Sequence, residues 1–412
     1  MRIAWLGLSP TEDVGTSYLA TQLLVELVRL GVDCEVFCAA AETSIHPRLR
    51  ASEDLRLFCL PSGWQPDRWY NRTPLSHHLS LTFARIRAQR RLAQTIVRRH
   101  AEHPYDLVYQ WSQIELFDLR RLRHRLPPIV LHPNAHAAGE LRWHRRERAL
   151  ARRGESLARY ATVEAMLMTR AFMQRRDVGL ARAIISPSQR FRELLCSDYS
   201  VPPERVHVVP NPLDLQRFRP DGATPRSGPL TLLFVSRIAV RKGVEMIVDL
   251  SHRLADLAGV VRIEVVGPQD TWSDYRHLLA DLDRRVASYV GPLPITKVAE
   301  LYREADLVLV PSLYDPCPSV VREALASGVP VVASSEVGSA EGIDPKVCAV
   351  FPAGDADAFE AVTRSLIGRL GDGEGPALAA VARAEVEPRF GGATVAAQVL
   401  DVLERTAGGP LV

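Results

Sequence analysis

The sequence predicts two doubly wound α/β domains in tandem that face a central cleft. Three observations predict this fold. The chain has 412 residues, which is long for a single hydrophobic core. Short apolar runs alternate with amphipathic helical runs over residues 1–210 and again over residues 230–388. Between the two series, residues 211–229 are rich in Pro, Gly and polar side chains, as expected of a linker.

The first residues set the pattern of the N-terminal domain, 1–210. A strand is predicted at 2–8, a loop with Gly15 follows, then a helix at 18–31 and a second strand at 32–39. Strand–helix–strand units of this length form parallel sheets. The remaining strands expected in this domain are 106–111, 128–132, 183–188 and 206–211, and residues 142–180 are expected to be helical.

The C-terminal domain, 230–388, repeats the alternation. Its expected strands are 230–237, 262–268, 288–293, 307–312, 329–334 and 348–353. The last segment, 389–412, is predicted to be a helix that packs back on the N-terminal domain. Because parallel strands end at one edge of a sheet, the cleft between two such domains is the natural place for a ligand.

Composition excludes several classes of protein. No apolar run approaches the ~20 residues of a membrane span, and the N-terminal apolar run is too short for a signal peptide. The six cysteines are scattered, without the spacing of a metal site or a disulfide framework, so we expect a reduced, cytoplasmic protein.

The charge is unevenly distributed. The 31 Arg and 21 acidic residues of 1–210 give a net charge of +10, and the 20 basic and 27 acidic residues that follow give −7. The basic half permits an anionic acceptor or a membrane surface, although Arg-rich stretches such as 85–100 are interpreted as solvated faces. These stretches lack interleaved aromatic residues, so nucleic acid is not expected as a partner. Membrane association is not favoured, and a homodimer is allowed.

Two cations are predicted to bind a diphosphate. Arg237 follows a strand, and Lys242 with Gly243 opens the next helix. A helix N-terminus adds free N–H groups and partial positive charge. Arg can hold two oxygens, while Lys supplies a point charge. Only three of the 51 basic residues are Lys. The use of Lys rather than Arg at position 242 therefore indicates that a compact ammonium is wanted there.

Two carboxylates flank the start of a later helix. Asp315 lies in the loop after the strand at 307–312, and Glu323 lies within the helix. Pro318 is predicted to be the first helical residue and Gly328 to end the helix in a left-handed conformation. An acid in the loop can accept sugar hydroxyls, and one on the helix can accept a ribose diol. A capping Asp and a solvated Glu are the structural alternative.

The pairing of R-x4-K-G at 237–243 with D-x7-E-A-L-A-S-G-V-P-V-V from 315 resembles the retaining GT-B glycosyltransferases of family 4. Further similar segments are MRIAWLGL with its glycine loop, SPSQRFRELL at 186–195 and VHVVPNPLDLQRFRP at 206–220. The resemblance covers nearly the whole chain and implies two Rossmann-like domains.

The resemblance also implies roles for particular residues. Arg237 and Lys242 would neutralise the donor diphosphate, Glu323 would hold the ribose, and Asp315 would orient the donor sugar. His132 would lie near the anomeric carbon, with His136 as a second candidate. The other residues implied are Gly15 and Thr16 for the diphosphate and acceptor, Gly291 and Leu293 for the base, and Cys317, Pro318 and Ser319 for the donor sugar.

Three positions depart from the family pattern. Asp315 replaces the usual first Glu, Pro318 replaces a Gly and removes an amide donor, and Pro212 stands where Gly is common. These departures concern how the donor sugar is held. They leave the diphosphate and ribose contacts unchanged.

The resemblance implies a retaining, metal-independent transfer of a hexosyl group from a UDP- or GDP-sugar to a small soluble, natural-product or sugar-phosphate acceptor. No cofactor is expected besides this donor substrate. The D-x-D pairs at 281–283 and 355–357 are interpreted as surface charge, so no metal site is predicted. The alternatives are a non-catalytic GT-B binding subunit and a GT-B nucleotide-sugar epimerase or phosphorylase. A nicotinamide dehydrogenase would require a G-x-G-x-x-G after the first strand, where SPTEDVGTS stands instead.

Overall fold

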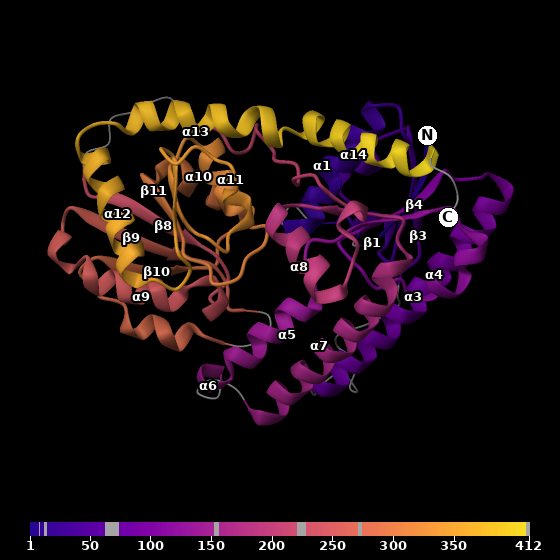
Figure 1. The fold of residues 1–412 in the computed structure, drawn as a ribbon, viewed down its shortest axis with the longest axis horizontal. Helices are drawn as coiled ribbons and strands as arrows, with labels where there is room; N and C mark the ends of the chain where they lie inside the picture. Colours follow the sequence, from indigo (N-terminus) through magenta and orange to yellow (C-terminus); the bar gives the residue numbers. More distant parts are fainter. Residues whose placement is uncertain are drawn as a thin grey trace.

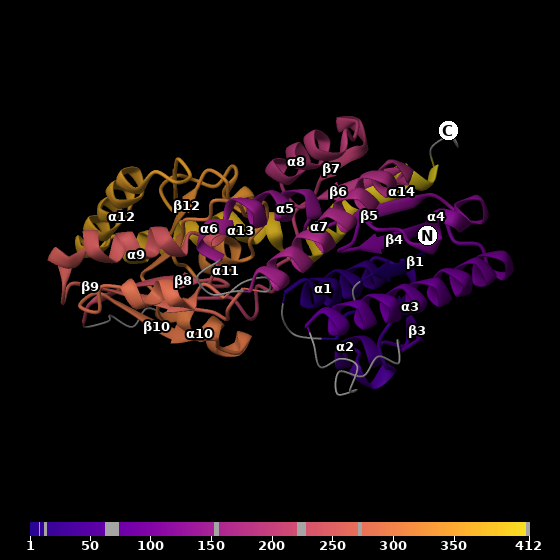
Figure 2. The ribbon, with the colours of Figure 1, turned by 90° about the horizontal axis from the view of Figure 1, so that it is seen from below.

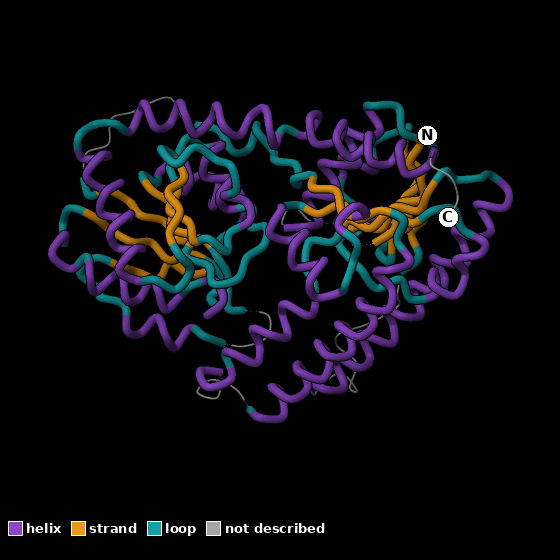
Figure 3. The backbone as a smooth tube through the Cα atoms, in the orientation of Figure 1, coloured by secondary structure: helices purple, strands orange, loops and turns teal. Residues whose placement is uncertain are grey.

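The computed structural model describes residues 1–7, 9–11, 15–61, 74–151, 156–220, 228–270 and 274–408. Two groups of strands, each enclosed by helices, lie in the two halves of the molecule (Figures 1 and 3). Some predicted features extend outside the described residues. They are the end of the first strand (Leu8), part of the glycine loop (12–14), part of the 142–180 helical stretch (152–155), part of the linker (221–227) and the last four residues (409–412).

The N-terminal sheet has seven parallel strands in the order β3-β2-β1-β4-β5-β6-β7. The strands are β1 Arg2–Gly7, β2 Asp33–Cys38, β3 Leu55–Cys59, β4 Leu107–Trp111, β5 Ile129–His132, β6 Ala183–Ser186 and β7 Val206–Val208. The helices are α1 Gly15–Arg29, α2 Pro47–Arg50, α3 Pro74–Glu102, α4 Asp118–Leu122, α5 Ala137–Arg146, α6 Arg148–Ala151, α7 Leu157–Asp177 and α8 Gln189–Tyr199. In Figure 2, α3 and α7 run along the outside of this half.

The C-terminal sheet has six parallel strands in the order β10-β9-β8-β11-β12-β13. The strands are β8 Leu230–Val235, β9 Val261–Val266, β10 Ala287–Gly291, β11 Leu307–Val310, β12 Val331–Ser334 and β13 Cys348–Phe351. The helices that follow β8 are α9 Val244–Arg253, α10 Ile295–Glu304, α11 Val320–Ala326, α12 Ala356–Gly371, α13 Gly375–Phe390 and α14 Gly392–Gly408. Apolar side chains cover both faces of the sheet, as a buried parallel sheet requires.

The strand order places the predicted site. In each sheet the winding direction reverses between the third and the fourth strand of the order, at β1/β4 and at β8/β11. Ligands of doubly wound folds bind outside the carboxyl ends of the strands at such a reversal. The loop after β8 carries Arg237 and Lys242, and the loop after β11 carries Asp315. Both loops therefore lie at the reversal of the second sheet.

Two local features differ from the sequence prediction. Strand β3 was not predicted, because LRLFC is a short run that pairs at a sheet edge. The prediction that Pro318 is the first helical residue was wrong, since α11 begins at Val320 after Ser319. Pro318 keeps the preceding Cys317 away from helical dihedrals. The loop is also held extended by a bridge between Asp315 and Val337. The predicted left-handed residue that ends the helix is confirmed at Gly328, with φ +81°.

The last two helices join the domains from outside. Helix α13 packs on the C-terminal sheet, and α14 crosses to the N-terminal half, as the upper edge of Figure 1 shows. The buried face of α14 belongs to the core around β1 and α1, through Val395, Ala396, Val399, Val402 and Leu403. Helix α14 is therefore part of the N-terminal core.

We expect Leu403→Ala to lower the free energy of unfolding by about 2–5 kcal/mol, because Leu403 is fully buried in that core. Denaturant unfolding followed by circular dichroism measures the change. Glu404→Ala, at the exposed neighbouring position, is the control. Equal stability of the two variants would contradict the placement of α14 in the N-terminal core.

Candidate functional site

An ion pair joins the two loops at the reversal of the second sheet. Lys242 ends a 3₁₀ turn, Val240–Lys242, and its Nζ lies 2.5 Å from Oδ2 of Asp315. Burial lowers the pKa of the Lys242 ammonium below its usual value, and the carboxylate of Asp315 opposes that shift. The predicted phosphate-binding cation and the predicted sugar-binding acid are thus in contact.

Gly243 allows the loop after β8 to approach the loop after β11. It precedes α9 with φ +82°, and a Cβ there would lie 2.1 Å from the carbonyl oxygen of Pro311. Arg237, the other predicted diphosphate ligand, lies on the surface two residues beyond β8. The structure therefore places both cations after the same strand, with Lys242 half-buried and Arg237 exposed.

Glu323 faces the interior of the C-terminal domain beside α10. The hydroxyl of Tyr302 donates to its carboxylate over 3.0 Å. Burial raises the pKa of the Glu323 carboxyl above its usual value, while hydrogen bonds from Ser319 and Tyr302 oppose the shift. Gly291 ends β10 beside a register shift, and Leu293 packs against the same core. Glu323, predicted to hold the ribose, therefore contacts α10, and Gly291 and Leu293, predicted to hold the base, precede that helix in the chain.

The loop between Asp315 and α11 contacts the N-terminal domain. The Ser188 hydroxyl donates to the Pro316 carbonyl over 2.5 Å, and Cys317 Sγ lies 3.8 Å from the Pro187 carbonyl. Pro318 is buried, and Ser319 directly precedes α11. The predicted donor-sugar loop is thus also an interdomain contact.

His132 ends β5 and is fully buried. The Tyr109 hydroxyl lies 2.5 Å from its Nδ1, and burial lowers the pKa of His132 to about 3, with the side chain of Asn211 opposing the shift. Because burial also raises the pKa of Tyr109 well above its usual value, that hydroxyl keeps its proton and can donate it to Nδ1. The neutral ring then carries its own proton on Nε2, which has no hydrogen-bond partner among the described residues.

The predicted residues of the glycine loop adjoin His132 through one aromatic side chain. Trp111 Nε1 donates to the carbonyl of Thr16 over 2.9 Å, and the Trp111 ring meets the His132 ring edge-on at 4.6 Å. Gly15 begins α1 with φ +56°, a conformation that favours glycine. The structure therefore brings Gly15, Thr16 and His132 to one region of the N-terminal domain.

His136 has a different environment. Its ring is buried, Nε2 lies 2.7 Å from Oδ2 of Asp198, and Nδ1 lies 3.0 Å from the hydroxyl of Tyr314. Tyr314 belongs to the C-terminal domain and precedes Asp315. Both ring nitrogens of His136 are thus occupied, Nε2 by Asp198 of the same domain and Nδ1 by an interdomain contact with Tyr314.

Sequence reasoning missed several residues that join the domains. Tyr314 stacks near Trp143 of α5, and Glu147 accepts from the backbone N–H of Arg241 (2.8 Å) and from the hydroxyl of Tyr275 (2.7 Å). Arg190 forms a bidentate pair with Glu336 across the same boundary. None of these belongs to a motif. Their roles depend on which surfaces meet, and local sequence carries no signal for that.

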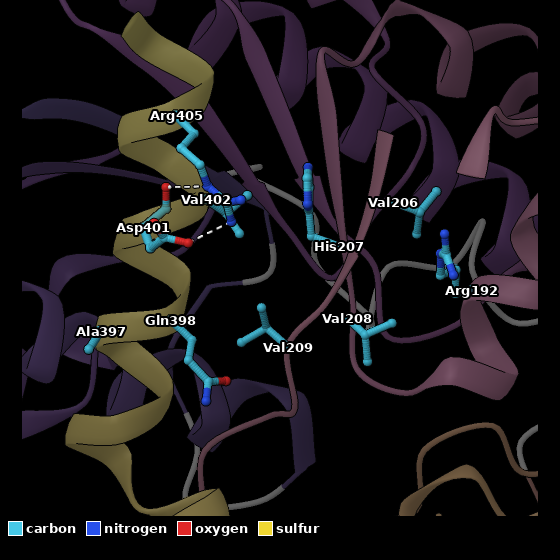
Figure 4. Close-up of a pocket in the computed structure, with 10 residues that line it drawn as sticks. All are labelled: Arg192, Val206, His207, Val208, Val209, Ala397, Gln398, Asp401, Val402 and Arg405. Carbon is cyan, nitrogen blue, oxygen red and sulfur yellow. Dashed lines mark hydrogen bonds and ion pairs between the residues drawn. The ribbon is translucent and has the colours of Figure 1, made fainter. Parts of the chain in front are cut away.

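Two cavities are present, and one of them adjoins the predicted donor-sugar loop. One of about 750 Å³ lies between edge strand β7 and helix α14 (Figure 4). It shares no lining residue with the predicted site, and its Arg405 pairs with Asp401 along the helix. The other, of about 260 Å³, lies between the domains beside Cys317 and Arg322.

The predicted absence of a metal site stays a prediction. Of the two D-x-D pairs, Asp355 caps α12 and Asp283 pairs with Arg285. In the parts of the chain that the structure describes, no group of three His, Cys, Asp or Glu side chains could hold a metal ion. Within the same ranges, every helix is too short or too polar to cross a membrane.

Comparison with protein families and relatives gives consistent matches. The model described as Glycosyltransferase Family 4 matches residues 15–217, and the model described as Glycosyl transferases group 1 matches residues 229–369. The MMP alpha-(1->4)-mannosyltransferase of Mycolicibacterium hassiacum is 28% identical, with 98% of each chain covered. The D-inositol 3-phosphate glycosyltransferase of Corynebacterium glutamicum is 25% identical over 81% of this chain and 80% of that protein.

Other matches are partial or concern only the fold. The amylovoran biosynthesis glycosyltransferase AmsK of Erwinia amylovora is 29% identical, over 50% of this chain and about half (52%) of its own length. Among solved structures, sucrose-phosphate synthase from Thermosynechococcus elongatus has a TM-score of 0.71 at 20% identity, covering 98% of each chain. Anabaena HepE in complex with UDP-glucose has a TM-score of 0.64 at 17% identity, covering 98% of this chain and 99% of its own.

We expect His132 to contribute to the pH dependence of stability. Its pKa is lowered to about 3 in the folded protein, so below about pH 6.5 the unfolded chain takes up a proton that the folded ring refuses. Stability should fall as the pH falls, by about 1.4 kcal/mol per pH unit from this one group. We would measure the free energy of unfolding in urea at several pH values between about 6.5 and 5. The free energy of unfolding should depend less steeply on pH in His132→Asn than in the wild type. Equal slopes would contradict a buried neutral ring.

We expect Gly139→Ala to loosen the contact between the domains. A Cβ at this position of α5 would lie 1.9 Å from the hydroxyl oxygen and 2.5 Å from Cζ of Tyr314, whose ring is buried. Overpacking of this kind costs about 1–3 kcal/mol, so an open arrangement should gain population. Small-angle X-ray scattering should report a larger radius of gyration. Gly179→Ala, with no atom within 4 Å of its Cβ, is the control, and identical profiles for both variants would refute the prediction.

Proposed function

Because this chain belongs to the group 1 glycosyltransferases of family 4, has the GT-B fold and is a hexosyltransferase, we propose a specific reaction for it. It transfers a hexosyl group from a UDP- or GDP-sugar to a small acceptor that carries a phosphate. The configuration of the anomeric carbon is retained, and no metal ion is required. The reaction takes place in the cytoplasm, in keeping with six unpaired cysteines.

The observation that carries this proposal is the ion pair of Lys242 with Asp315 at the reversal of the C-terminal sheet. The donor diphosphate binds between Lys242 and Arg237. The ammonium of Lys242 then pairs with the diphosphate in place of Asp315. Asp315 is then released to accept hydroxyls of the donor sugar. The pair keeps the half-buried ammonium compensated until the donor arrives, since a charge with reduced access to water is costly without a partner.

The two cations stabilise the charge that grows on the leaving diphosphate oxygen as its bond to the anomeric carbon breaks. This is why no metal ion is needed. The acceptor oxygen forms its bond on the same face of the sugar, and its proton passes to the leaving diphosphate. Glu323 fixes the nucleoside through the ribose hydroxyls, within reach of the amides before α11. The structure of Anabaena HepE in complex with UDP-glucose supports a uridine donor.

His132 acts as a neutral hydrogen-bond donor in this reaction. With Nδ1 held by Tyr109, its Nε2–H can donate to a hydroxyl of the transferred sugar. Its pKa of about 3 keeps the ring uncharged at neutral pH. A protein base is not required, because the leaving diphosphate accepts the acceptor proton.

The phosphate on the acceptor is suggested by two observations. The N-terminal half carries a net charge of +10, which attracts an anion. The names of relatives specify D-inositol 3-phosphate, and that of a structural neighbour specifies sucrose phosphate. A sugar phosphate or cyclitol phosphate is therefore the acceptor class to test first.

We expect Lys242→Ala to abolish micromolar binding of UDP or GDP and to lower kcat/KM by about 10²–10³, because it removes a charge placed at the leaving group. Calorimetric titration of nucleoside diphosphates, followed by turnover assays in excess EDTA, measures both effects. Lys297→Ala is the matched control, since Lys297 is exposed and pairs with Glu300 one turn away.

Two outcomes would reject the proposal. Unchanged nucleotide affinity in Lys242→Ala would place the donor elsewhere. A folded wild type that binds neither UDP nor GDP would favour a non-catalytic binding subunit.

A further inference from the structure

The cavity between the domains adjoins Arg322 on a different face of α11 from Glu323, and Cys317 of the predicted donor-sugar loop is among its lining residues. Its walls come from the N-terminal domain, from helix α14 and from the C-terminal domain. Successive residues of a helix point about 100° apart. Glu323 faces Tyr302, whereas Arg322 lines the cavity and donates through Nη1 to the backbone carbonyl of Asn211. Two adjacent residues of one short helix thus serve different sites.

Arg322 is a buried cation that forms no ion pair with the described residues. Its side chain is 1% exposed. Two of its donor atoms, Nε and Nη2, have no hydrogen-bond partner in the part of the chain that the structure describes. The guanidinium lies 5.6 Å from the ring centre of Phe390, which offers only partial compensation. Burying an uncompensated charge is strongly unfavourable, so the site is incomplete as it stands.

A second buried polar group without a partner lines the same cavity. Ser339 lies in the 3₁₀ turn Gly338–Ala340, is 7% exposed, and its hydroxyl has no hydrogen bond. The acid among the lining residues, Glu341, does not neutralise Arg322. Its carboxylate instead accepts the backbone N–H groups of Gln189 (2.8 Å) and Arg190 (2.7 Å) at the start of α8.

We propose that this cavity binds a small phosphate-type oxyanion, held by the free donors of Arg322 and by the hydroxyl of Ser339. The planar fork of Arg suits two oxygens of one tetrahedral anion, and a hydroxyl completes the set. A volume of about 260 Å³ accommodates inorganic phosphate or a phosphomonoester with a small organic group. Inorganic phosphate and a phosphomonoester present the same chemical group to the site, and the titration of both distinguishes between these two sources.

Occupation of this site stabilises the closed arrangement of the domains. Its walls include Ser188 and Pro210 from the N-terminal side and Arg322 and Ser339 from the C-terminal side. A ligand that contacts both sides binds the closed form more tightly than an open one, and by linkage it shifts the population toward closure. The anion is therefore an effector of closure, distinct from the donor and the acceptor.

The test uses the full chain carrying Arg237→Ala and Lys242→Ala, so that the proposed donor site cannot contribute to anion binding. Inorganic phosphate and glycerol 3-phosphate are titrated into this parent by calorimetry. We expect one site that saturates below about 20 mM. Adding Arg322→Met should weaken binding about tenfold, and adding Arg322→Lys or Ser339→Ala about threefold, because each removes charged or neutral hydrogen bonds. Ser197→Ala, on the exposed face of α8, should leave the affinity unchanged.

The proposal is overturned if the parent binds neither anion, or if Arg322→Lys and Ser339→Ala bind both as tightly as the parent. These two variants decide the matter even if Arg322→Met fails to fold. Tighter binding of inorganic phosphate identifies the free anion as the ligand, and tighter binding of glycerol 3-phosphate identifies an ester. Scattering profiles with and without the anion should show contraction. Nucleotide binding by the chain with Lys242 intact is a separate readout, so failure of either proposal is recognised independently.

Discussion

The ion pair between Lys242 and Asp315 is the interaction on which the rest of the site depends. A half-buried ammonium favours a nearby anion, and Asp315 is the carboxylate in the loop after the neighbouring strand. The pair fixes the start of the loop that leads to α11. That loop presents Tyr314 to His136 and the Pro316 carbonyl to Ser188, so the position of one ion pair sets the contacts through which the two domains meet.

Adjacent residues of α11 contact different parts of the molecule. On one face, Glu323 accepts a hydrogen bond from Tyr302 of α10. On the other, Arg322 reaches the linker carbonyl of Asn211 and the end of α13. Asn211 also contacts Asn134 and lies beside His132. The linker residue Asn211 therefore contacts groups beside both His132 and the cavity between the domains.

The strands of both sheets could be predicted because a buried parallel strand is a short apolar run between turns. Strand β3 was missed because an edge strand with a single buried residue at its start does not stand out from the surrounding sequence. Lys242 and Glu323 were found because their spacing belongs to a motif. Tyr314, Glu147 and Arg190 were not, because they act between surfaces that are distant in the sequence.

The sequence by itself determined the two-domain α/β architecture, the residues at the carboxyl ends of β8 and β11, and the family. These follow from periodicity and motif spacing, which are local properties of the chain. Only the tertiary structure decided that Asp315 pairs with Lys242, that His136 is enclosed between the domains, and that Arg322 is buried without an anion. The physical reason is that burial and charge compensation depend on which elements pack together, and many packings share one local pattern.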